Sequence, residues 1–183
     1  MRIETLIRRA LRLQDHRVVK VKLVRGGVLE AHLERIKRRR LRCGQCGCKG
    51  EGTRGRRRER RWRDMYVLAH PLVIVYAPYR VTCPRCGVRV ERLPWATPWA
   101  RVTRALGRMV ALWTRKLCWT DVAELFGLNW KTVVGIVRWA VEWGLAHRQL
   151  RPVRVLGMDE VSRAKGHRYF SLFYDLKRRI LLW

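Results

Sequence analysis

The chain has 183 residues and carries 42 Lys and Arg against 14 Asp and Glu, a formal net charge of +28. This balance predicts a polyanionic partner, either nucleic acid or an anionic membrane surface. Hydrophobic residues make up 48% of the chain, too many for a disordered basic tail. The longest apolar run, Leu72–Ala77, is too short to cross a bilayer, and no signal peptide is recognisable. We therefore expect a cytoplasmic protein with no membrane partner.

The first predicted elements are a helix and a β-hairpin. Apolar residues at helical spacing predict a short helix over residues 3–11. Apolar and charged residues then alternate on both sides of Arg25-Gly26-Gly27, which predicts a hairpin over Arg17–Glu34. Residues 1–36 are expected to form one N-terminal unit.

Two Cys-x-x-Cys-Gly motifs predict a metal site. They are Cys43-Gly-Gln-Cys46-Gly47 and Cys83-Pro-Arg-Cys86-Gly87. Four thiolates in two close pairs are the ligand set of a structural Zn²⁺ site, which leaves no open position for catalysis. The Gly after each second Cys lets backbone N–H groups turn back toward sulfur. Cys48 is a spare thiol that could replace Cys46, and Cys118 is expected to be a small core residue.

Arginine dominates the segment between the two motifs. Residues 35–63 hold fourteen Lys or Arg and two Glu, with blocks at Arg38–Arg40 and Arg54–Arg63. Phosphates relieve the self-repulsion of such blocks, so we expect sequence-independent contacts to a nucleic-acid backbone rather than solvated loops. The expected contacts are Arg56, Arg57, Arg58, Arg60 and Arg61.

Short strands are predicted at Pro71–Tyr76, Tyr79–Cys83 and Val88–Glu91. Together with the Cys motifs, they indicate a zinc-ribbon domain over residues 37–94. A helix is predicted to start at Thr97-Pro98, where a hydroxyl N-cap precedes Pro at the first helical position, and to run to about residue 117.

Two further helices, at Asp121–Phe126 and Trp130–Leu145, fit a helix-turn-helix motif over Trp119–Arg138. Ala123 is the small contact and Gly127 the turn, and the alternative is a generic helical hairpin. Apolar residues that would seal the two helices together are Val122, Phe126, Leu128, Val133 and Ile136. Thr120 and Asn129 are expected to cap the two helices.

The second of these helices is expected to face duplex DNA. In this motif, residues at its N-terminal end contact base edges or phosphates. The expected contacts are Asn129, Lys131, Thr132 and Arg138. Trp130 is outward by position, although the core is the commoner place for a Trp. Sequence specificity would come from this helix, because contacts to phosphate carry no sequence information.

Three strands are predicted after Pro152, at Val153–Met158, Arg168–Tyr174 and Arg179–Trp183. The first is expected to be buried and to end at Asp159. That carboxylate has two interpretations, a functional group or an ordinary strand-end Asp. Asp175 falls in a polar turn and is interpreted as turn chemistry.

The ordered set of motifs resembles the ISL-three family of bacterial insertion-sequence transposases from about Ile3 to Trp183. Besides the Cys motifs, the residues that carry the resemblance are Arg63-Asp64, Val122–Val133, Gly157–Glu160, Lys165–Tyr169 and Tyr174–Leu176. The resemblance implies an α+β multidomain protein. It would hold the N-terminal hairpin and zinc ribbon, a helix-turn-helix domain at 97–149, and the first strands of an incomplete ribonuclease H-like catalytic domain at 152–183.

The family's catalytic domain holds an Asp-Asp-Glu triad that binds two Mg²⁺ for in-line attack on DNA phosphate. By this resemblance, Asp159 matches the first carboxylate, and the other two would lie beyond Trp183. We therefore expect an N-terminal fragment that binds DNA without strand transfer, with Mg²⁺ only in a full-length catalytic form. Whether this chain is itself an enzyme is left open.

The expected partner is double-stranded DNA, the inverted repeats of the element, bound by a nucleoid-associated protein. Whether the chain forms a homo-oligomer is left open. An alternative is a non-enzymatic zinc-ribbon and helix-turn-helix regulator of DNA. A third is an RNA-binding zinc ribbon with arginine-rich arms. The helix-turn-helix argues against RNA, because A-form grooves do not admit a recognition helix.

Overall fold

The computed structural model describes residues 3–11, 13, 15–36, 40–97, 100–149 and 151–182. The predictions that involve Arg38, Arg39 and Pro98 lie outside these ranges. Contacts divide the chain into two compact units, Met1–Val141 and Glu142–Trp183. Within the described ranges, no helix is both long enough and apolar enough to span a bilayer.

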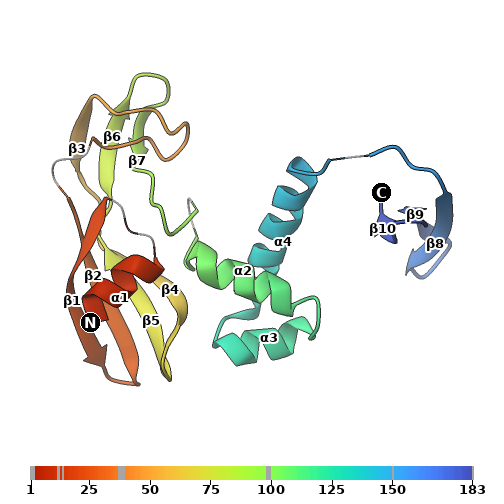
Figure 1. Cartoon of the computed structure of the whole chain (residues 1–183), viewed down its shortest axis with the longest axis horizontal. Helices are drawn as coiled ribbons and strands as arrows, with labels where there is room; N and C mark the ends of the chain where they lie inside the picture. Colours follow the sequence, from red (N-terminus) through yellow and green to blue (C-terminus); the bar gives the residue numbers. More distant parts are fainter. Residues whose placement is uncertain are drawn as a thin grey trace. The chain divides into compact units, whose positions relative to one another are not determined.

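A four-stranded sheet forms the first part of the first unit (Figure 1). Its order is β1-β2-β5-β4, with β2 and β5 parallel and the other pairs antiparallel. The strands are β1 (His16–Val24), β2 (Val28–Arg35), β4 (Arg60–Val67) and β5 (His70–Tyr76), and the helix α1 (Ile3–Ala10) precedes them. The predicted N-terminal helix and hairpin are therefore confirmed.

Alternation along the strands places the side chains that form the two core clusters of this sheet on one face. Ile7 of α1 packs there against Leu29, Ala31 and Leu72. A second cluster on the sheet is closed by the segment that follows β7, and consists of Leu13, Leu33, Trp62, Ile74, Tyr76, Leu93, Trp95 and Ala96. The sheet is thus covered partly by α1 and partly by a segment distant in sequence.

A smaller sheet holds β3 (Gly52–Arg56), β6 (Tyr79–Cys83) and β7 (Gly87–Val90) in the order β3-β6-β7. The strands predicted at β5, β6 and β7 are confirmed within a residue or two. The predicted boundary at residue 36 differs from the structure, since β4 and β5 pair with the N-terminal hairpin. An isolated hairpin is marginal in water, and the parallel β2–β5 pairing extends it into a sheet.

The arginine-rich run also differs from the expected charge block. Arg54–Arg56 lie in β3 and Arg60–Arg63 in β4, so only a short connection between them is without strand structure. In β4, Trp62 is fully buried while Arg61 is exposed. Alternation therefore lets a strongly basic segment contribute a core residue.

Three helices complete the first unit: α2 (Arg104–Trp113), α3 (Trp119–Phe126) and the first part of α4 (Trp130–Ala146). The five predicted sealing residues belong to one cluster with α2: Val122, Phe126, Val133 and Ile136 are buried, and Leu128 is partly buried against them. The predicted start of α2 at Thr97 is wrong, because the helix begins after its N-cap Thr103. Thr120 is also not a cap. It lies inside α3, whose N-cap is Cys118.

The second unit contains an antiparallel sheet of order β10-β9-β8, formed by β8 (Leu156–Ala164), β9 (Arg168–Asp175) and β10 (Ile180–Leu181). The first strand was expected to be buried over Val153–Met158. It begins instead at Leu156, and every residue except the half-buried Gly157 is exposed. The strand runs on past Asp159, which pairs in register with Leu172.

Candidate metal centre and nucleic-acid interface

The two Cys motifs come together at one end of the smaller sheet. The four Sγ atoms all lie within 4.8 Å of one another, and they belong to Cys43, Cys46, Cys83 and Cys86. Cys43 and Cys83 are buried, Cys86 is half-buried and Cys46 is exposed. This arrangement could hold a metal ion, and four thiolates are the donor set of a structural Zn²⁺ site.

The local backbone explains how each motif presents two sulfurs. Gly47 and Gly87 have φ values of 73° and 70°, in the left-handed region that favours glycine. The Gly47 N–H donates to the Cys43 carbonyl oxygen at 3.0 Å, which closes the first turn. In that turn, the Gln45 N–H donates to Cys43 Sγ at 3.4 Å. The predicted role of the glycines in tight turns fits this geometry.

The pKa values of the two thiols in the second motif are shifted in opposite directions. Burial acts to raise the pKa of Cys83, but hydrogen bonds from the backbone N–H groups of Arg85 and Cys86 and from the other thiols together lower that pKa to about 7. The Cys46 thiol and then burial raise the pKa of Cys86 to about 12. Metal binding at such a cluster must displace the remaining protons.

The other two cysteines lie outside this group. Cys48 is half-buried, and its carbonyl oxygen accepts a 2.9 Å hydrogen bond from the Cys43 N–H. It therefore supports the turn through its backbone, while Cys46 supplies the fourth sulfur. The expectation that Cys118 is a core residue is wrong. It is exposed at the N-cap of α3, with its sulfur 2.8 Å from the Thr120 hydroxyl.

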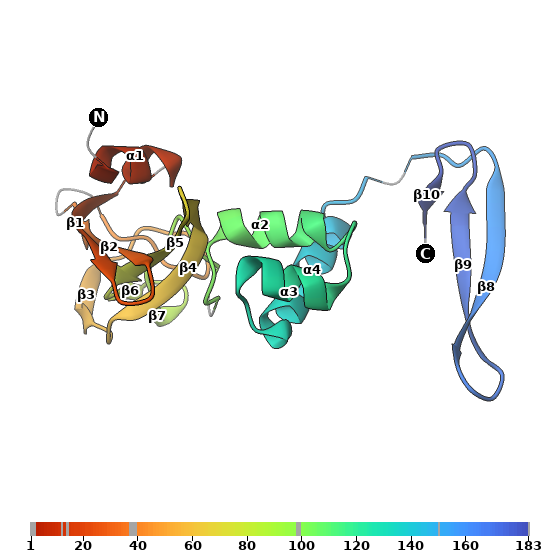
Figure 2. The ribbon, with the colours of Figure 1, turned by 90° about the horizontal axis from the view of Figure 1, so that it is seen from below.

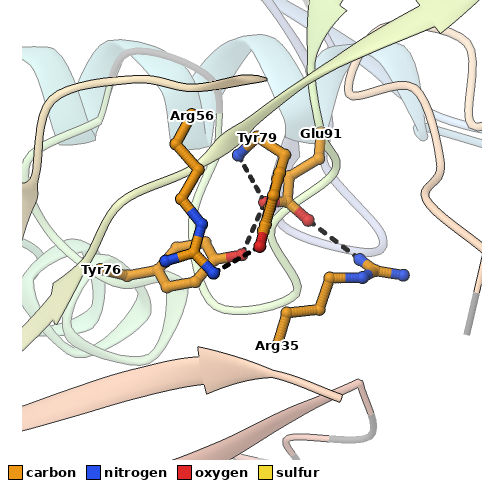
Figure 3. A network of polar contacts seen from close by, with 5 residues as sticks. All are labelled: Arg35, Arg56, Tyr76, Tyr79 and Glu91. Atoms are coloured by element: carbon orange, nitrogen blue, oxygen red, sulfur yellow. Dashed lines mark hydrogen bonds and ion pairs between the residues drawn. The ribbon is translucent and has the colours of Figure 1, made fainter. Parts of the chain in front are cut away.

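Glu91 connects the end of the fold that holds the four cysteines to the four-stranded sheet (Figure 3). Its carboxylate accepts hydrogen bonds from the Tyr76 hydroxyl at 2.7 Å and the Tyr79 N–H at 2.8 Å, and from Arg35 at 3.0 Å. Its backbone forms an isolated bridge with Cys43. Burial and the Glu91 charge strongly raise the pKa of Tyr76, so the phenol stays a donor.

Sequence reasoning did not identify Glu91 as a site residue. It is only 2% exposed, in a chain where acidic residues are few. A lone Glu four residues after Gly87 of the second Cys motif is the signal that could have found it, because a buried carboxylate requires partners.

The strand β4 also connects to the helical part of the first unit, beside the start of α2 (Figure 2). The Arg63 N–H donates to the Arg101 carbonyl oxygen at 2.9 Å, and the Thr103 N–H donates to the Arg63 carbonyl oxygen at 2.8 Å. The Arg63 guanidinium reaches the Phe126 carbonyl oxygen at 3.5 Å. One residue of β4 thus contacts both the approach to α2 and the end of α3.

The helix pair places its predicted contact residues largely on the surface. Asn129 caps α4, since its Oδ1 accepts a 2.9 Å hydrogen bond from the Lys131 N–H. Lys131 and Arg138 are exposed, whereas Thr132 is half-buried. Trp130 is 49% exposed, and its ring centroid lies 6.3 Å from that of Trp119. Gly127 takes the left-handed conformation at the C-cap of α3, as the predicted turn requires.

The five predicted arginine contacts fall into two groups. Arg57 and Arg58 are exposed. The other three are held by the protein: Arg56 donates to the Tyr79 hydroxyl, Arg60 donates to the Ala100 carbonyl oxygen at 3.2 Å, and Arg61 pairs with Glu30. Such contacts fix the guanidinium groups without removing their positive charge.

Asp159 is exposed, and its Oδ1 accepts a 2.8 Å hydrogen bond from the Glu160 N–H. In the described ranges, it belongs to no group of three His, Cys, Asp or Glu side chains that could share an ion. Asp175 is buried and accepts hydrogen bonds from Arg178, which agrees with its interpretation as a turn residue. The acidic side chains of this part do not fit a Mg²⁺ pair, and no catalytic step follows from them.

The chain is similar to transposases of insertion sequences. It is 30% identical over 142 residues to the transposase for insertion sequence element IS1001 of Bordetella parapertussis. The matched segment covers 77% of this chain and 35% of that protein. It is 33% identical over 147 residues to the transposase for element IS1557 in two strains of Mycobacterium tuberculosis, covering 78% of this chain and 32% of those proteins.

No family model matches the chain, and no solved structure matches it. The chain spans about a third of the length of the curated relatives it matches. Over most of its own length it is thus a homologue of proteins named as insertion-sequence transposases.

Proposed function

We propose that the chain is the DNA-binding part of an insertion-sequence transposase of the ISL-three type. In this proposal, a zinc ribbon and a helix-turn-helix recognise the inverted repeats at the ends of the element. The observation that carries the proposal is the similarity to named transposases over more than three quarters of the chain. The net charge of +28 supports a nucleic-acid partner.

The metal would act structurally. Zn²⁺ at Cys43, Cys46, Cys83 and Cys86 would tie residues on either side of the basic strands to one centre. The smaller sheet would then present arginines, and α4 would present Asn129, Lys131, Thr132 and Arg138 to the major groove. Phosphate contacts would supply most of the affinity, and α4 the sequence preference.

Asp159 stays a prediction as the first carboxylate of a catalytic triad, and strand transfer is not proposed for this chain by itself. The relatives' names do not favour the alternative of a non-enzymatic regulator. Self-association on paired element ends remains part of the proposal.

The test measures binding to three labelled probes: a duplex carrying the terminal repeat next to the gene, a shuffled duplex of equal composition, and a structured RNA of equal length. We expect the terminal repeat to bind most tightly, with a margin over the shuffled duplex that persists when salt is raised. Preference for the RNA would contradict the proposal. Equal affinity for the terminal-repeat duplex and the shuffled duplex would contradict recognition of the element ends, although not DNA binding itself.

A further inference from the structure

A cavity of about 590 Å³ lies between the first Cys motif, β7 and the start of α2. Residues from five separate stretches of the first unit line it, and six of them are arginines: Arg57, Arg60, Arg80, Arg89, Arg92 and Arg104. Only Arg57 and Arg60 belong to the runs that the sequence identified. The fold therefore assembles a basic pocket from residues that look scattered along the chain.

The pocket's single acidic residue does not offset this charge. Glu91 is buried, and both carboxylate oxygens already accept hydrogen bonds, Oε2 from Arg35 and Oε1 from Tyr76 and Tyr79. Within the described part of the chain, no carboxylate lies within ion-pair distance of Arg57, Arg80, Arg92 or Arg104. The pocket thus concentrates positive charge that an anion could neutralise.

Its arginines repel one another. Burial lowers the pKa of Arg60, and the charges of Arg101 and Arg57 lower it further. Burial also lowers the pKa of Arg104, and the charge of Arg92 adds to that effect. Arg104 is the first residue of α2, whose first turn has no acidic side chain, so the helix dipole adds positive potential. An anion in the pocket would relieve each of these costs.

Two arginines are already oriented. Arg89 donates from Nε to the Gln45 side chain at 2.8 Å, and Arg60 is held by the Ala100 carbonyl oxygen. The remaining wall includes the aliphatic side chains Val88, Val90, Leu93 and Ala96. Aliphatic surface beside guanidinium groups suits a deoxyribose next to its phosphate better than it suits a free inorganic ion.

We propose that this pocket binds the sugar-phosphate backbone of DNA, with Arg80, Arg92 and Arg104 as phosphate contacts in addition to Arg57 and Arg60. The inference rests on the proposed function. It specifies which part of the protein would bind the backbone of one DNA strand. Because a phosphate contact is the same at every base pair, the pocket contributes affinity and salt dependence but no sequence preference.

The test compares two double variants of the full chain that lose the same charge. Arg80→Gln with Arg92→Gln changes the pocket, and Lys22→Gln with Arg25→Gln changes exposed cations of the N-terminal hairpin. Each lost phosphate contact reduces the slope of log affinity against log salt by about 0.9. We expect a reduction of about 2 for the pocket pair and less than half of that for the hairpin pair. Zinc content and thermal midpoint verify that both are folded.

A second readout does not depend on duplex binding. Inorganic pyrophosphate should raise the thermal midpoint of the wild-type chain and of the hairpin pair, but not that of the pocket pair. Equal salt slopes for the two pairs, with duplex binding intact, would refute the pocket and leave the proposed function standing. Stabilisation by pyrophosphate without any duplex binding would refute the proposed function and assign the pocket to a free phosphate ester.

Discussion

The Thr103 hydroxyl donates a 2.6 Å hydrogen bond to Asp64 Oδ1, while its own oxygen accepts a 3.2 Å bond from the Leu106 N–H. One side chain is therefore both the N-cap of α2 and the partner of a buried carboxylate in β4. Asp64 also accepts a 2.8 Å bond from the Met65 N–H. This relationship fixes the sheet to the helices within the first unit, as the proposed binding of one duplex by both parts would require.

Replacing Thr103 by Val keeps its shape but removes both hydrogen bonds. We expect a loss of about 3 kcal/mol in the free energy of unfolding, from the lost cap and the poorly satisfied Asp64 carboxylate. Thr103→Ser keeps the hydroxyl and should lose much less. Urea denaturation of the two variants measures the difference, and a Val variant as stable as the Ser variant would contradict this role.

The metal ligands can be separated from the spare thiol by paired substitutions. Cys46→Ser should abolish stable zinc binding and unfold the smaller sheet, because three thiolates remain. Cys48→Ser should retain one zinc per chain, because its sulfur lies outside the cluster. Metal analysis of the purified variants checks both. Loss of zinc in Cys48→Ser with retention in Cys46→Ser would reverse the assignment.

The buried ion pair of Glu91 should matter more than an exposed one. Glu91→Gln weakens its bond to Arg35, whose side chain is 9% exposed, and we expect a loss of about 2–4 kcal/mol in stability. The control is Glu34→Gln, which breaks the exposed pair with Arg17 and should cost less than about 1 kcal/mol. Similar losses in chemical denaturation would show that Glu91 has no special role.

His16 should make stability depend on pH below neutrality. The ring is 1% exposed, its two nitrogens have no hydrogen-bond partner among the residues that the structure describes, and burial lowers its pKa from 6.5 to about 4. Between these values the unfolded chain binds the proton and the folded chain does not, so stability falls as pH falls from 6.5 toward 4. At a pH below both pKa values, the free energy of unfolding would be lower by roughly 3 kcal/mol than at neutral pH because of this group.

His16→Phe keeps an aromatic ring against Tyr76 and Trp95, and it removes this titration. The wild type should therefore lose unfolding free energy relative to the variant as pH falls from 7 to 4.5, whichever of the two is more stable at pH 7. Using the difference cancels the effect of acid on any metal bound at the four cysteines, because both proteins have the same cluster. A difference that is constant over this range would contradict the buried neutral imidazole.

The helix-turn-helix prediction is tested at Lys131, which is exposed in the first turn of α4. Lys131→Ala should weaken binding to the terminal repeat about 10-fold or more, as expected for loss of one specific contact. Lys116→Ala, an exposed cation before α3, is the matched control. Anisotropy titrations at fixed salt compare them, and equal effects would mean that α4 is not the reading helix.

Local patterns predicted most elements of the first unit. Alternation around Arg25-Gly26-Gly27 predicted the hairpin, and the spacing of apolar residues about Gly127 predicted α3 and α4. The four-sulfur cluster followed from two motifs whose spacing carries its own chemistry. The residues that determine each turn, helix and Cys pair are neighbours in sequence, although the two Cys pairs themselves are far apart.

The errors arose where distant residues decide. Thr97 and Thr103 both resemble N-caps, but residues 101–103 pair with Arg63 of β4, and this keeps them out of the helix. Glu91 was missed because its side-chain partners lie 12 to 56 residues away. For the same reason, the parallel β2–β5 pairing and the six-arginine pocket have no local signature.

The decisive experiment is native mass spectrometry of the full chain, mixed with equal amounts of terminal-repeat duplex and shuffled duplex. We expect one zinc ion per chain and a complex formed preferentially with the terminal repeat. A chain without tightly bound metal that still forms this complex would contradict the structural role of the thiolates. A zinc-bound chain that forms no complex with either duplex would contradict DNA binding itself.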